Sequence, residues 1–493
     1  MKKTMIFMML FASITVLQCC TSDSADETTE VWDDAATEYG QASSTLDDNQ
    51  VSVIWSGTTA AVSVADNISA QVIATIKGGH VCIIATSDLQ QEVTYTLSGT
   101  ATDGSLYMDG DYKATFVLNG LSLTSNRTDS AAINIRNGKR IAIVISDGTT
   151  NTLTDKSGGS HKGCMMVNGH TEFEGGGTLN IAGKSSNAFW GDEYVKLKSG
   201  TGTINIKSAV DDGINVNQYF QMKGGTINIS GVGDDGIAVA ATDDTTDEYN
   251  GQMMLEDGTA TISVTGSKGK ALKSEGALTI SGGTYTLSST SNEAIESEST
   301  IDISGGVVYA TAKDDAINSA SHMTISGGYV MGYSTGNDGL DANGNMYIKG
   351  GTVYAICSGQ PEVALDANTE RGYKLYVQGG TVVAVGGLES GASLSQSCYA
   401  TSSWSRNTWY ALYNGSTLAL AFKAPGSGGS GMVVSTSSTP SLKSGVSVSS
   451  GTALFDGMGY SSDATLSGGT SVTLSSYSGG NGMGGGMGPG GRW

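Results

Sequence analysis

Pairs of acidic residues recur along the chain, each followed at once by a small residue and then by Ile. The sequence reads VDDGI at 210–214, GDDGI at 233–237 and KDDAI at 313–317. Carboxylates at a regular spacing could gather a hard cation, act as general acids and bases, or support turns by accepting hydrogen bonds from backbone N–H groups. Which of these roles applies depends on whether the fold brings the pairs together.

The acidic pairs belong to a longer repeat in which a small residue precedes a large apolar one. Most copies lie about 23 residues apart, two longer intervals fit loop insertions, and paired glycines such as Gly305-Gly306 keep the same spacing. Short alternating strands at this period, without helices, are typical of a parallel β-helix, here of about ten coils. The glycine pairs fit sharp turns that need a positive φ. The repeat comprises Ala132-Ile133, Cys164-Met165, Ala188-Phe189, Gly213-Ile214, Gly236-Ile237, Ala271-Leu272, Ala294-Ile295, Ala316-Ile317, Gly339-Leu340 and Ala364-Leu365.

In a β-helix each coil stacks on the next at about 4.8 Å, so equivalent residues form columns. The acidic pairs make two adjacent columns, and the residue after each inward Ile or Leu makes a third column that points outward. Carboxylates stacked about 5 Å apart repel by roughly 3 kcal/mol at an effective dielectric constant near 20, so the repulsion must be relieved. Asp, Asn and Glu without nearby His or Cys pairs favour Ca²⁺ over Zn²⁺. The expected calcium ligands are Asp211, Asp212, Asp234, Asp235, Glu293, Glu296, Asp314, Asp315, Asp338 and Asp341.

The acidic residues admit other interpretations. Asp and Asn also support β-helix turns by bonding backbone N–H groups. The insertion at 241–258 adds Asp243, Asp244, Asp247 and Glu248, either as further ligands or as a solvated loop. Hydrolysis by two carboxylates is a further possibility, although no single pair stands out for it.

One lysine interrupts the acidic columns. Its position suggests, as an alternative to a binding protein, that the chain is an enzyme. Lys270 takes the place that carboxylates hold in neighbouring coils. In a calcium-dependent polysaccharide lyase, Lys270 would be the base, with Asp234, Asp235 and Glu293 as metal ligands. Flanking carboxylates tend to keep a lysine protonated, which suits a salt-bridged spacer better than a base. A non-catalytic adhesin, with no calcium-dependent ligand, is a third class of function.

Aromatic residues follow the glycine pairs on an outward column. Tyr309 and Tyr354 lie on this column and Tyr329 flanks it. They could form a platform for sugar rings, or they could stiffen the sheet by stacking across coils. Together with Lys273, they are the candidate carbohydrate-binding residues.

Composition and charge limit the partners. The net charge of −21 makes nucleic acid and anionic membrane surfaces unsuitable partners and fits a bound divalent cation. Residues 1–20 read as a secretory signal that ends in Leu17-Gln18-Cys19-Cys20, which resembles a bacterial lipobox with Cys20 as the lipidated residue. We therefore expect an exported, monomeric lipoprotein, anchored to the outer membrane and displayed at the cell surface, with plain secretion as the alternative. The other thiols are too few and too far apart for a disulfide framework and are expected as small core residues; these are Cys82, Cys164, Cys357 and Cys398.

Two long stretches of the chain resemble a known family. Residues 268–318, from KGKALKSEGALTISGG to KDDAIN, look like the carbohydrate-binding β-helix family that binds cellulose and acidic sugars. Residues 95–155, which end in NTLTD, resemble the first coils of the same family, and the similarity covers about residues 75–385. The resemblance implies a right-handed parallel β-helix related to pectate lyases, with calcium and a polygalacturonate-like polysaccharide as ligands. Asn337 and the unpaired Glu362 depart from the acidic pattern in the last coils.

The C-terminal part differs in character from the repeat. Residues 399–422 are rich in aromatic side chains, including Trp404, Trp409, Tyr410 and Tyr413, and are expected to cover the open end of the β-helix. A second sugar-binding surface is the alternative for this region. The expected organisation is a signal peptide at 1–20, an acidic tether at 21–50, the β-helix at 51–385, a β-rich C-terminal cap at 386–478 and a Gly/Met-rich disordered tail at 479–493.

Overall fold

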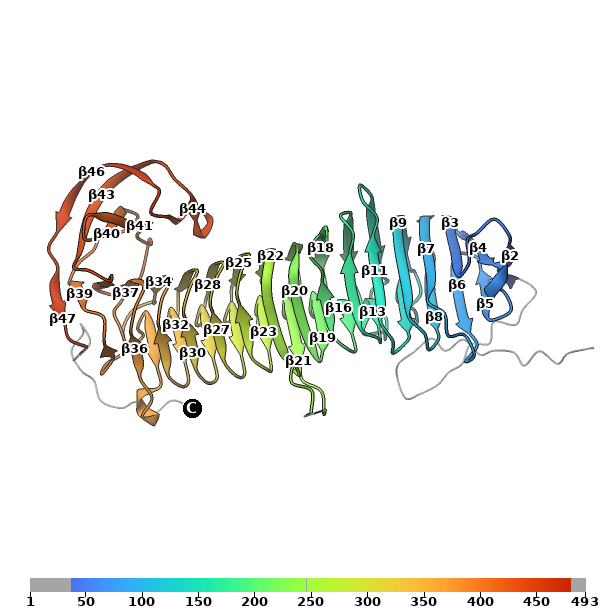
Figure 1. Cartoon of the computed structure of the whole chain (residues 1–493), viewed down its shortest axis with the longest axis horizontal. Helices are drawn as coiled ribbons and strands as arrows, with labels where there is room; N and C mark the ends of the chain where they lie inside the picture. The colour runs from blue at the N-terminus through green and yellow to red at the C-terminus, as the bar shows by residue number, and fades with distance from the viewer. Residues whose placement is uncertain (1–36, 245, 480–493) are drawn as a thin grey trace, which may run out of the picture.

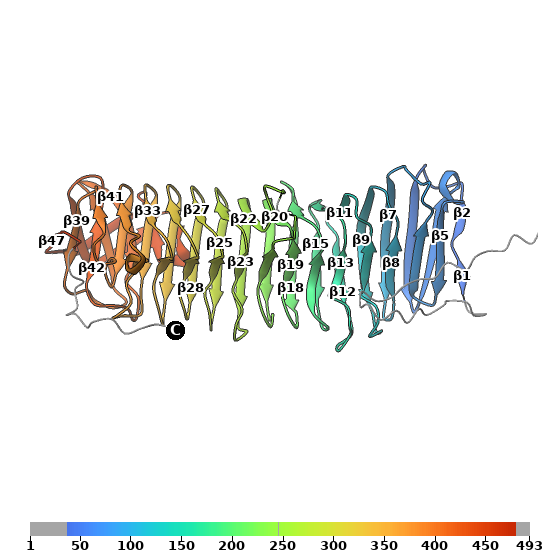
Figure 2. The same cartoon turned by 90° about the horizontal axis from the view of Figure 1, so that it is seen from below.

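The chain forms an elongated β-solenoid. The computed structural model describes residues 37–244 and 246–479, and the predictions for the signal peptide, Cys20, residues 21–36 and residues 480–493 lie outside this range. Successive coils follow the long axis of the molecule from the N-terminal to the C-terminal end (Figures 1 and 2). The helices among the described residues are single short turns, and none is long and apolar enough to cross a bilayer. They are η1 (Asp66–Ile68), η2 (Thr369–Arg371) and η3 (Phe455–Gly457).

One sheet, called here the first sheet, runs along the whole solenoid and confirms the repeat. The apolar residue of all ten predicted steps lies on one of its strands, and β6 and β8 add two more coils upstream. Its parallel strands are β6 (His80–Ala85), β8 (Ser105–Asp109), β10 (Ile133–Arg136), β13 (Gly163–Val167), β16 (Asn187–Gly191), β19 (Ile214–Asn217), β21 (Ile237–Ala240), β23 (Leu272–Ser274), β26 (Ile295–Ser297), β29 (Ile317–Ser319), β32 (Leu340–Ala342) and β35 (Leu365–Ala367).

Two further stacks of parallel strands complete each coil. The second stack contains β11 (Ile141–Ile145), β14 (Thr171–Glu174), β17 (Val195–Leu197), β24 (Leu278–Ile280), β27 (Ile301–Ile303), β30 (Met323–Ile325), β33 (Met346–Ile348), β36 (Leu375–Val377) and β38 (Ser393–Leu394). The third stack contains β12 (Thr150–Thr154), β15 (Thr178–Ala182), β18 (Thr203–Ser208), β25 (Thr284–Ser289), β28 (Val307–Ala312), β31 (Tyr329–Ser334), β34 (Thr352–Ile356) and β37 (Thr381–Val385). Long strands contribute to both stacks, namely β3 (Gln50–Gly57), β7 (Val93–Ala101), β9 (Ala114–Thr124), β20 (Tyr219–Ser230) and β22 (Gln252–Val264).

The glycine pairs turn the chain between the second and third stacks. In Gly305-Gly306 and Gly327-Gly328 the second glycine has a φ of 78° and 75°, as the pattern predicted. A Cβ atom on Gly328 would lie 2.7 Å from backbone atoms of the coil below, so the turn excludes side chains by close approach as well as by φ.

Apolar side chains fill the interior of every coil as continuous columns. All the residues expected to point inward are at most 2 % exposed, namely Ile227, Ile229, Leu278, Ile280, Ile301, Ile303, Leu375 and Val377. Cys164, Cys357 and Cys398 are free and buried, as expected of small core residues. Cys82 corrects that expectation, because it is disulfide-bonded. It packs with Tyr107 and Ile84 in a small cluster separate from the main core.

The N-terminal end is closed by antiparallel strands. β5 (Val72–Lys77) pairs antiparallel with β6, and β4 (Thr59–Ala65) with β3. β1 (Glu38–Tyr39) pairs with β5, and β2 (Gln41–Ser43) pairs with β4. Part of the segment expected as a tether is therefore folded, because these short strands cover edges of the first hairpins.

The C-terminal region folds back beside the last coils (Figure 1). β42 (Met432–Ser435) pairs antiparallel with β37 and so covers the final edge of the third stack. A six-stranded antiparallel sheet, the C-terminal sheet, packs Tyr410 and Phe422 against Tyr354 and Val383 of the third stack. Its strands are β40 (Trp409–Asn414), β41 (Thr417–Lys423), β43 (Pro440–Ser450), β44 (Ala453–Leu454), β45 (Gly459–Tyr460) and β46 (Thr465–Val472), while β39 (Cys398–Thr401) and β47 (Ser475–Tyr477) pair with each other beside it.

Candidate binding face

The second residue of each acidic pair lies just before a strand of the first sheet. These residues stack from coil to coil, and the column that they form is called here the inner carboxylate column. It is made up of the aspartates Asp212, Asp235, Asp315 and Asp338, and Lys270 and Glu293 stand at the same register in the two coils between Asp235 and Asp315. Asp212 Oδ1 accepts a hydrogen bond from the backbone N–H of Asp235 in the next coil at 2.8 Å. Asp235 Oδ1 accepts from Lys270 N–H at 2.8 Å, and Asp338 Oδ1 accepts from Val363 N–H at 2.6 Å. Each carboxylate therefore ties its own coil to the following one, which is the turn-supporting role left open by the sequence.

The inner carboxylate column is buried, whereas the sequence led us to expect a surface column. Its four side chains are between 2 % and 8 % exposed. Burial, and after it the charge of nearby carboxylates, raises the pKa of Asp235 to about 7, of Asp315 to about 8 and of Asp338 to about 9. At neutral pH, Asp235 is therefore near its titration point, whereas Asp315 and Asp338 are largely protonated.

The first residue of each pair forms a more exposed outer column. Asp211 is exposed and accepts a hydrogen bond from Ser186 Oγ at 2.8 Å. Asp314 is half-buried and accepts a hydrogen bond from Asn337 Nδ2 at 2.7 Å. Asn337 therefore bridges two coils where a second carboxylate would repel, which accounts for this departure from the acidic pattern.

Lys270 occupies the inner carboxylate column as a cation between carboxylates. Its Nζ lies 3.1 Å from Glu296 and 3.7 Å from Glu293, and its side chain is 13 % exposed. Burial alone would lower the pKa of Lys270, but Glu296 and Glu293 together raise it above its usual value. Lys270 is thus held protonated, which is the spacer arrangement and opposes a role as a base.

Replacing Lys270 with Met is expected to lower the free energy of unfolding by about 3 kcal/mol, because Glu293 and Glu296 lose their cation in a largely buried place. Urea unfolding at pH 7 measures the change. The double variant Lys270→Met, Glu296→Gln should recover much of the loss, since it removes one of the stranded carboxylates. A single variant as stable as the parent chain would contradict the spacer role.

The third, outward column changes in composition toward the C-terminal end. Asn215 Nδ2 donates to Asp212 Oδ2 at 2.7 Å, and Asn318 Nδ2 donates to Asp315 Oδ2 at 3.0 Å. Asp341 takes the position of these asparagines beside Asp338. In those two earlier coils an amide donates to the inner carboxylate. In this coil Asp341, a carboxylate, stands close enough to raise the pKa of Asp338, and it accepts a hydrogen bond from Asn318 Nδ2 of the preceding coil at 3.4 Å.

Acidic residues continue along this column in the next two coils. Asp366 pairs in register with Asp341, and Glu389 follows at the end of the first sheet. Burial, and after it a hydrogen bond with Glu389, raises the pKa of Asp366. Asp338, Asp341, Asp366 and Glu389 are called here the acidic cluster. Asp366 and Glu389 were not among the expected ligands, although both continue a column that the repeat defines.

The arrangement of these carboxylates can be compared with the site that Ca²⁺, the expected cofactor, requires. In the parts of the chain that the structure describes, no group of three or more His, Cys, Asp or Glu side chains is placed to hold a metal ion. The donors of the acidic cluster are oxygens only, which fits Ca²⁺ in kind. A calcium ion at the cluster would therefore require its side chains to turn toward a common centre.

The insertion at 241–258 lies apart from the acidic columns. The insertion follows β21, whereas Asp234 and Asp235 precede that strand, so the length of β21 separates the insertion from the acidic pair. Asp244 Oδ1 accepts a hydrogen bond from the N–H of Thr246 at 2.9 Å. Asp247 accepts one from Gln218 Nε2. These contacts correspond to the solvated-loop interpretation of the insertion.

The comparisons with known proteins assign the solenoid to a family. The model of a family described as carbohydrate-binding domain-containing proteins matches residues 85–362. The chain belongs to this family. The matched carbohydrate-binding domain contains the inner carboxylate column and Lys270, whereas Asp366, Glu389 and the C-terminal sheet lie beyond it.

Two proteins illustrate how far the similarity extends. A carbohydrate-binding domain-containing protein of Acetivibrio thermocellus is 28 % identical over 120 residues, which are 22 % of this chain and 41 % of that protein. The chain thus spans less than half the length of this relative. A solved structure, the polysaccharide lyase-like protein from C. thermocellum as a gadolinium derivative, covers 60 % of this chain and 99 % of its own at 20 % identity, with a TM-score of 0.40.

The three tyrosines expected as a sugar platform are covered by the C-terminal sheet, and this corrects the expectation. Tyr354 is fully buried, its ring packs against Phe422 and its hydroxyl donates to Lys423 O at 2.9 Å. Tyr309 and Tyr329 are half-buried and pack against the same cluster. The tyrosines are outward-facing on the solenoid but inward-facing in the whole protein. Lys273 remains half-exposed on the first sheet, 3.8 Å from Glu298.

A different set of aromatic rings borders the first sheet of the carbohydrate-binding domain. His170, Tyr194 and Tyr219 stack with centroids 4.5 Å and 4.8 Å apart, and Tyr249 follows at 5.6 Å. Lys196 Nζ lies 4.2 Å above the Tyr194 ring. The four rings are called here the aromatic stack. They are 24, 25 and 30 residues apart in the sequence, so the coil repeat itself could have revealed them.

Proposed function

We propose that the protein binds an acidic polysaccharide along the outward face of the first sheet, with calcium joining carboxylates of the protein to carboxylates of the sugar. The observation that carries the proposal is the replacement of Asn by Asp341 beside Asp338, which leaves an all-carboxylate cluster where the coils of Asp212 and Asp315 place an amide. The family supports a carbohydrate as the ligand.

Charge explains why a cation belongs in the proposal. A chain with a net charge of −21 repels a polyuronate. A divalent cation held by the acidic cluster reverses the local sign and offers free coordination positions to sugar carboxylates. Asp338, Asp341, Asp366 and Glu389 are the residues that would hold it. Lys273, in the same outward column, would add a direct ion pair to the glycan.

The aromatic stack supports a second kind of contact with the same glycan. It lies at the edge where the chain leaves the first sheet, while the acidic columns lie at the edge where it enters. Tyr249 is 43 % exposed at one end of the stack. Since the first three rings cover one another's faces, the stack would offer ring edges and hydroxyl groups along its length and a ring face at Tyr249.

The proposal is for capture of the polysaccharide and not for its cleavage. Lys270, the residue that would serve as the base of a lyase, is held protonated by Glu293 and Glu296. Export as an outer-membrane lipoprotein through Cys20 would place the acidic face outside the cell, where polysaccharide is met. This proposed location is inferred from the sequence alone, namely from the lipoprotein signal at residues 1–20 and the acidic tether that follows it.

Calorimetric titration of residues 21–493 with polygalacturonate tests the function. We expect binding in about 2 mM calcium, a concentration above the dissociation constants of typical extracellular calcium sites. We also expect loss of binding in chelator and no rise in the ultraviolet absorbance of unsaturated uronides. The variant Asp341→Asn, Asp366→Asn should weaken binding by about tenfold or more, equivalent to about 1.4 kcal/mol.

Asp302→Asn is the matched control, because Asp302 is an exposed carboxylate on the second stack, away from the first sheet. Equal loss in this control would mean that net charge alone governs binding. Binding in chelator would remove calcium from the proposal. Rising absorbance that disappears in Lys270→Ala would make the protein a lyase, and no binding in any condition would leave a passive adhesin.

A further inference from the structure

The C-terminal region contains an open cleft that lies outside the matched carbohydrate-binding domain. Its volume is about 780 Å³, which is in the range of small-molecule sites. It is bordered by β39, the loop that follows it, β47 and the face of the C-terminal sheet that carries Tyr410 and Ser444. Neither the acidic cluster nor the aromatic stack contributes to it.

The chemistry of the cleft wall is uniform. Nine of its lining residues are Ser or Thr, three are aromatic, and none is charged. The aromatic residues are Trp404, Tyr410 and Tyr477. Without a charged group the wall offers no anchor for an anion or a cation, and its many hydroxyl groups disfavour an apolar ligand. Tyr410 is buried, whereas Trp404 and Tyr477 are half-exposed. Hydroxyl groups beside these two half-exposed rings match a ligand that is itself uncharged and carries hydroxyls around an apolar ring face.

The aromatic edge of the cleft is held in place by hydrogen bonds. Trp404 Nε1 donates to Gly429 O at 3.0 Å, which fixes the half-exposed indole ring. The N–H of Ser405 donates to the hydroxyl of Tyr410 at 2.7 Å, and Thr401 Oγ1 donates to Ser403 O at 3.1 Å. The loop is therefore pre-organised, which lowers the entropy cost of binding.

We propose that this cleft is a second binding site, specific for a neutral oligosaccharide, with Trp404 as the ring that contacts a sugar face. The site goes beyond the proposed function, because it needs neither calcium nor a charged sugar. It would let one chain hold two chemically different glycans, an acidic one on the solenoid and a neutral one at the C-terminal end.

Calorimetry with a hexamer of β-1,4-linked glucose, in chelator, tests the site on residues 21–493. We expect binding to the parent chain and no binding of trigalacturonate under the same conditions. Ser444→Phe should weaken binding of the hexamer by about tenfold or more by filling the cleft. Ser441→Phe is its matched control on the opposite face of β43, and it should bind like the parent chain.

A second pair of variants guards against loss of folding. Trp404→Leu should weaken binding by a similar factor, whereas Trp409→Leu, on the neighbouring strand and absent from the cleft wall, should not. Circular dichroism and the calcium-dependent binding of polygalacturonate report whether each variant is folded. Absence of hexamer binding to the parent chain, or equal binding by Ser444→Phe and Trp404→Leu, would overturn the second site while leaving the acidic face untouched.

Discussion

Without calcium, the free energy of unfolding is expected to fall as the pH rises from about 5 to about 9. The cause is the inner carboxylate column, since the pKa values of Asp235, Asp315 and Asp338 are raised to about 7, 8 and 9 in the folded chain. A raised carboxyl pKa means that the folded state binds the proton more tightly than the unfolded state. The contribution to stability is therefore complete below about pH 4, the unfolded pKa, and is lost as the pH rises through the folded pKa.

Calcium should oppose this loss if the proposed function is right. A cation at the acidic cluster stabilises the ionised form of Asp338, so saturating calcium should raise the melting temperature more at pH 9 than at pH 5. Urea unfolding at several pH values, in chelator and in calcium, measures both effects. A free energy of unfolding that does not change with pH in chelator would contradict the burial of the column. An equal calcium effect at pH 5 and pH 9 would contradict a calcium site among these carboxylates.

Substitutions at Asp315 separate the hydrogen bond from the charge. Asp315 Oδ1 accepts the N–H of Asp338 at 2.9 Å, a bond that an Asn side chain can also accept. Asn187 already plays this part by accepting the N–H of Asp212 at 2.9 Å. At pH 9, Asp315→Asn is expected to raise the free energy of unfolding on the order of 2 kcal/mol. It removes a buried charge and keeps the acceptor for the N–H of Asp338, and this gain exceeds the loss of the hydrogen bond from Asn318 Nδ2 to Oδ2.

Asp315→Ala is the matched comparison for the hydrogen bond. It leaves the buried N–H of Asp338 without its acceptor, which costs about 1–3 kcal/mol. At pH 4 most of the advantage of Asn should vanish, since the Asp315 carboxyl is then protonated in the folded state and about half protonated in the unfolded state. Equilibrium unfolding of the three proteins at the two pH values provides the data. If Asn and Ala were equally destabilising at pH 9, the column would not work as an acceptor for backbone N–H groups.

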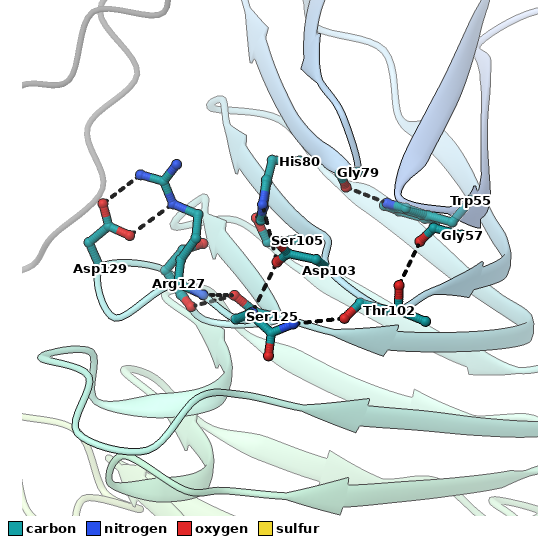
Figure 3. A network of polar contacts seen from close by, with 12 residues as sticks. Trp55, Gly57, Gly79, His80, Thr102, Asp103, Ser105, Ser125, Arg127 and Asp129 are labelled. Carbon is teal, nitrogen blue, oxygen red and sulfur yellow. Dashed lines mark hydrogen bonds and ion pairs between the residues drawn. The ribbon is translucent and has the colours of Figure 1, made fainter.

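The repeat could be read from the sequence because stacking makes each coil obey the same local rules. The step before Ile317 and the glycine pair Gly327-Gly328 each fix one position in a coil, and the structure places them as expected. The two upstream coils were missed for different reasons. At β6 the step lacks a small residue, because His80 precedes Val81, and at β8 the step is Ser105-Leu106, with Ser where the ten predicted steps have Ala, Gly or Cys. His80 stands there beside Ser105, within a polar network that also involves Asp103 and Arg127 (Figure 3).

The burial of side chains beyond the solenoid core could not be read in the same way. Tyr354 has the outward position that its place after the glycine pair predicts, but the C-terminal sheet covers it, and that contact joins residues about 70 positions apart. The inner carboxylate column was expected at the surface, since a run of acids normally is. The hydrogen bond from each following backbone N–H, visible only in three dimensions, is what allows the carboxylates to be buried.

Diffraction from crystals grown with calcium and trigalacturonate is the decisive test of calcium-mediated capture on the first sheet. We expect an ion within bonding distance of the Asp341 and Asp366 side chains, with a sugar carboxylate as a further ligand, on the outward face of the first sheet. Sugar bound elsewhere, or an acidic cluster that stays free of calcium while the sugar binds, would contradict it.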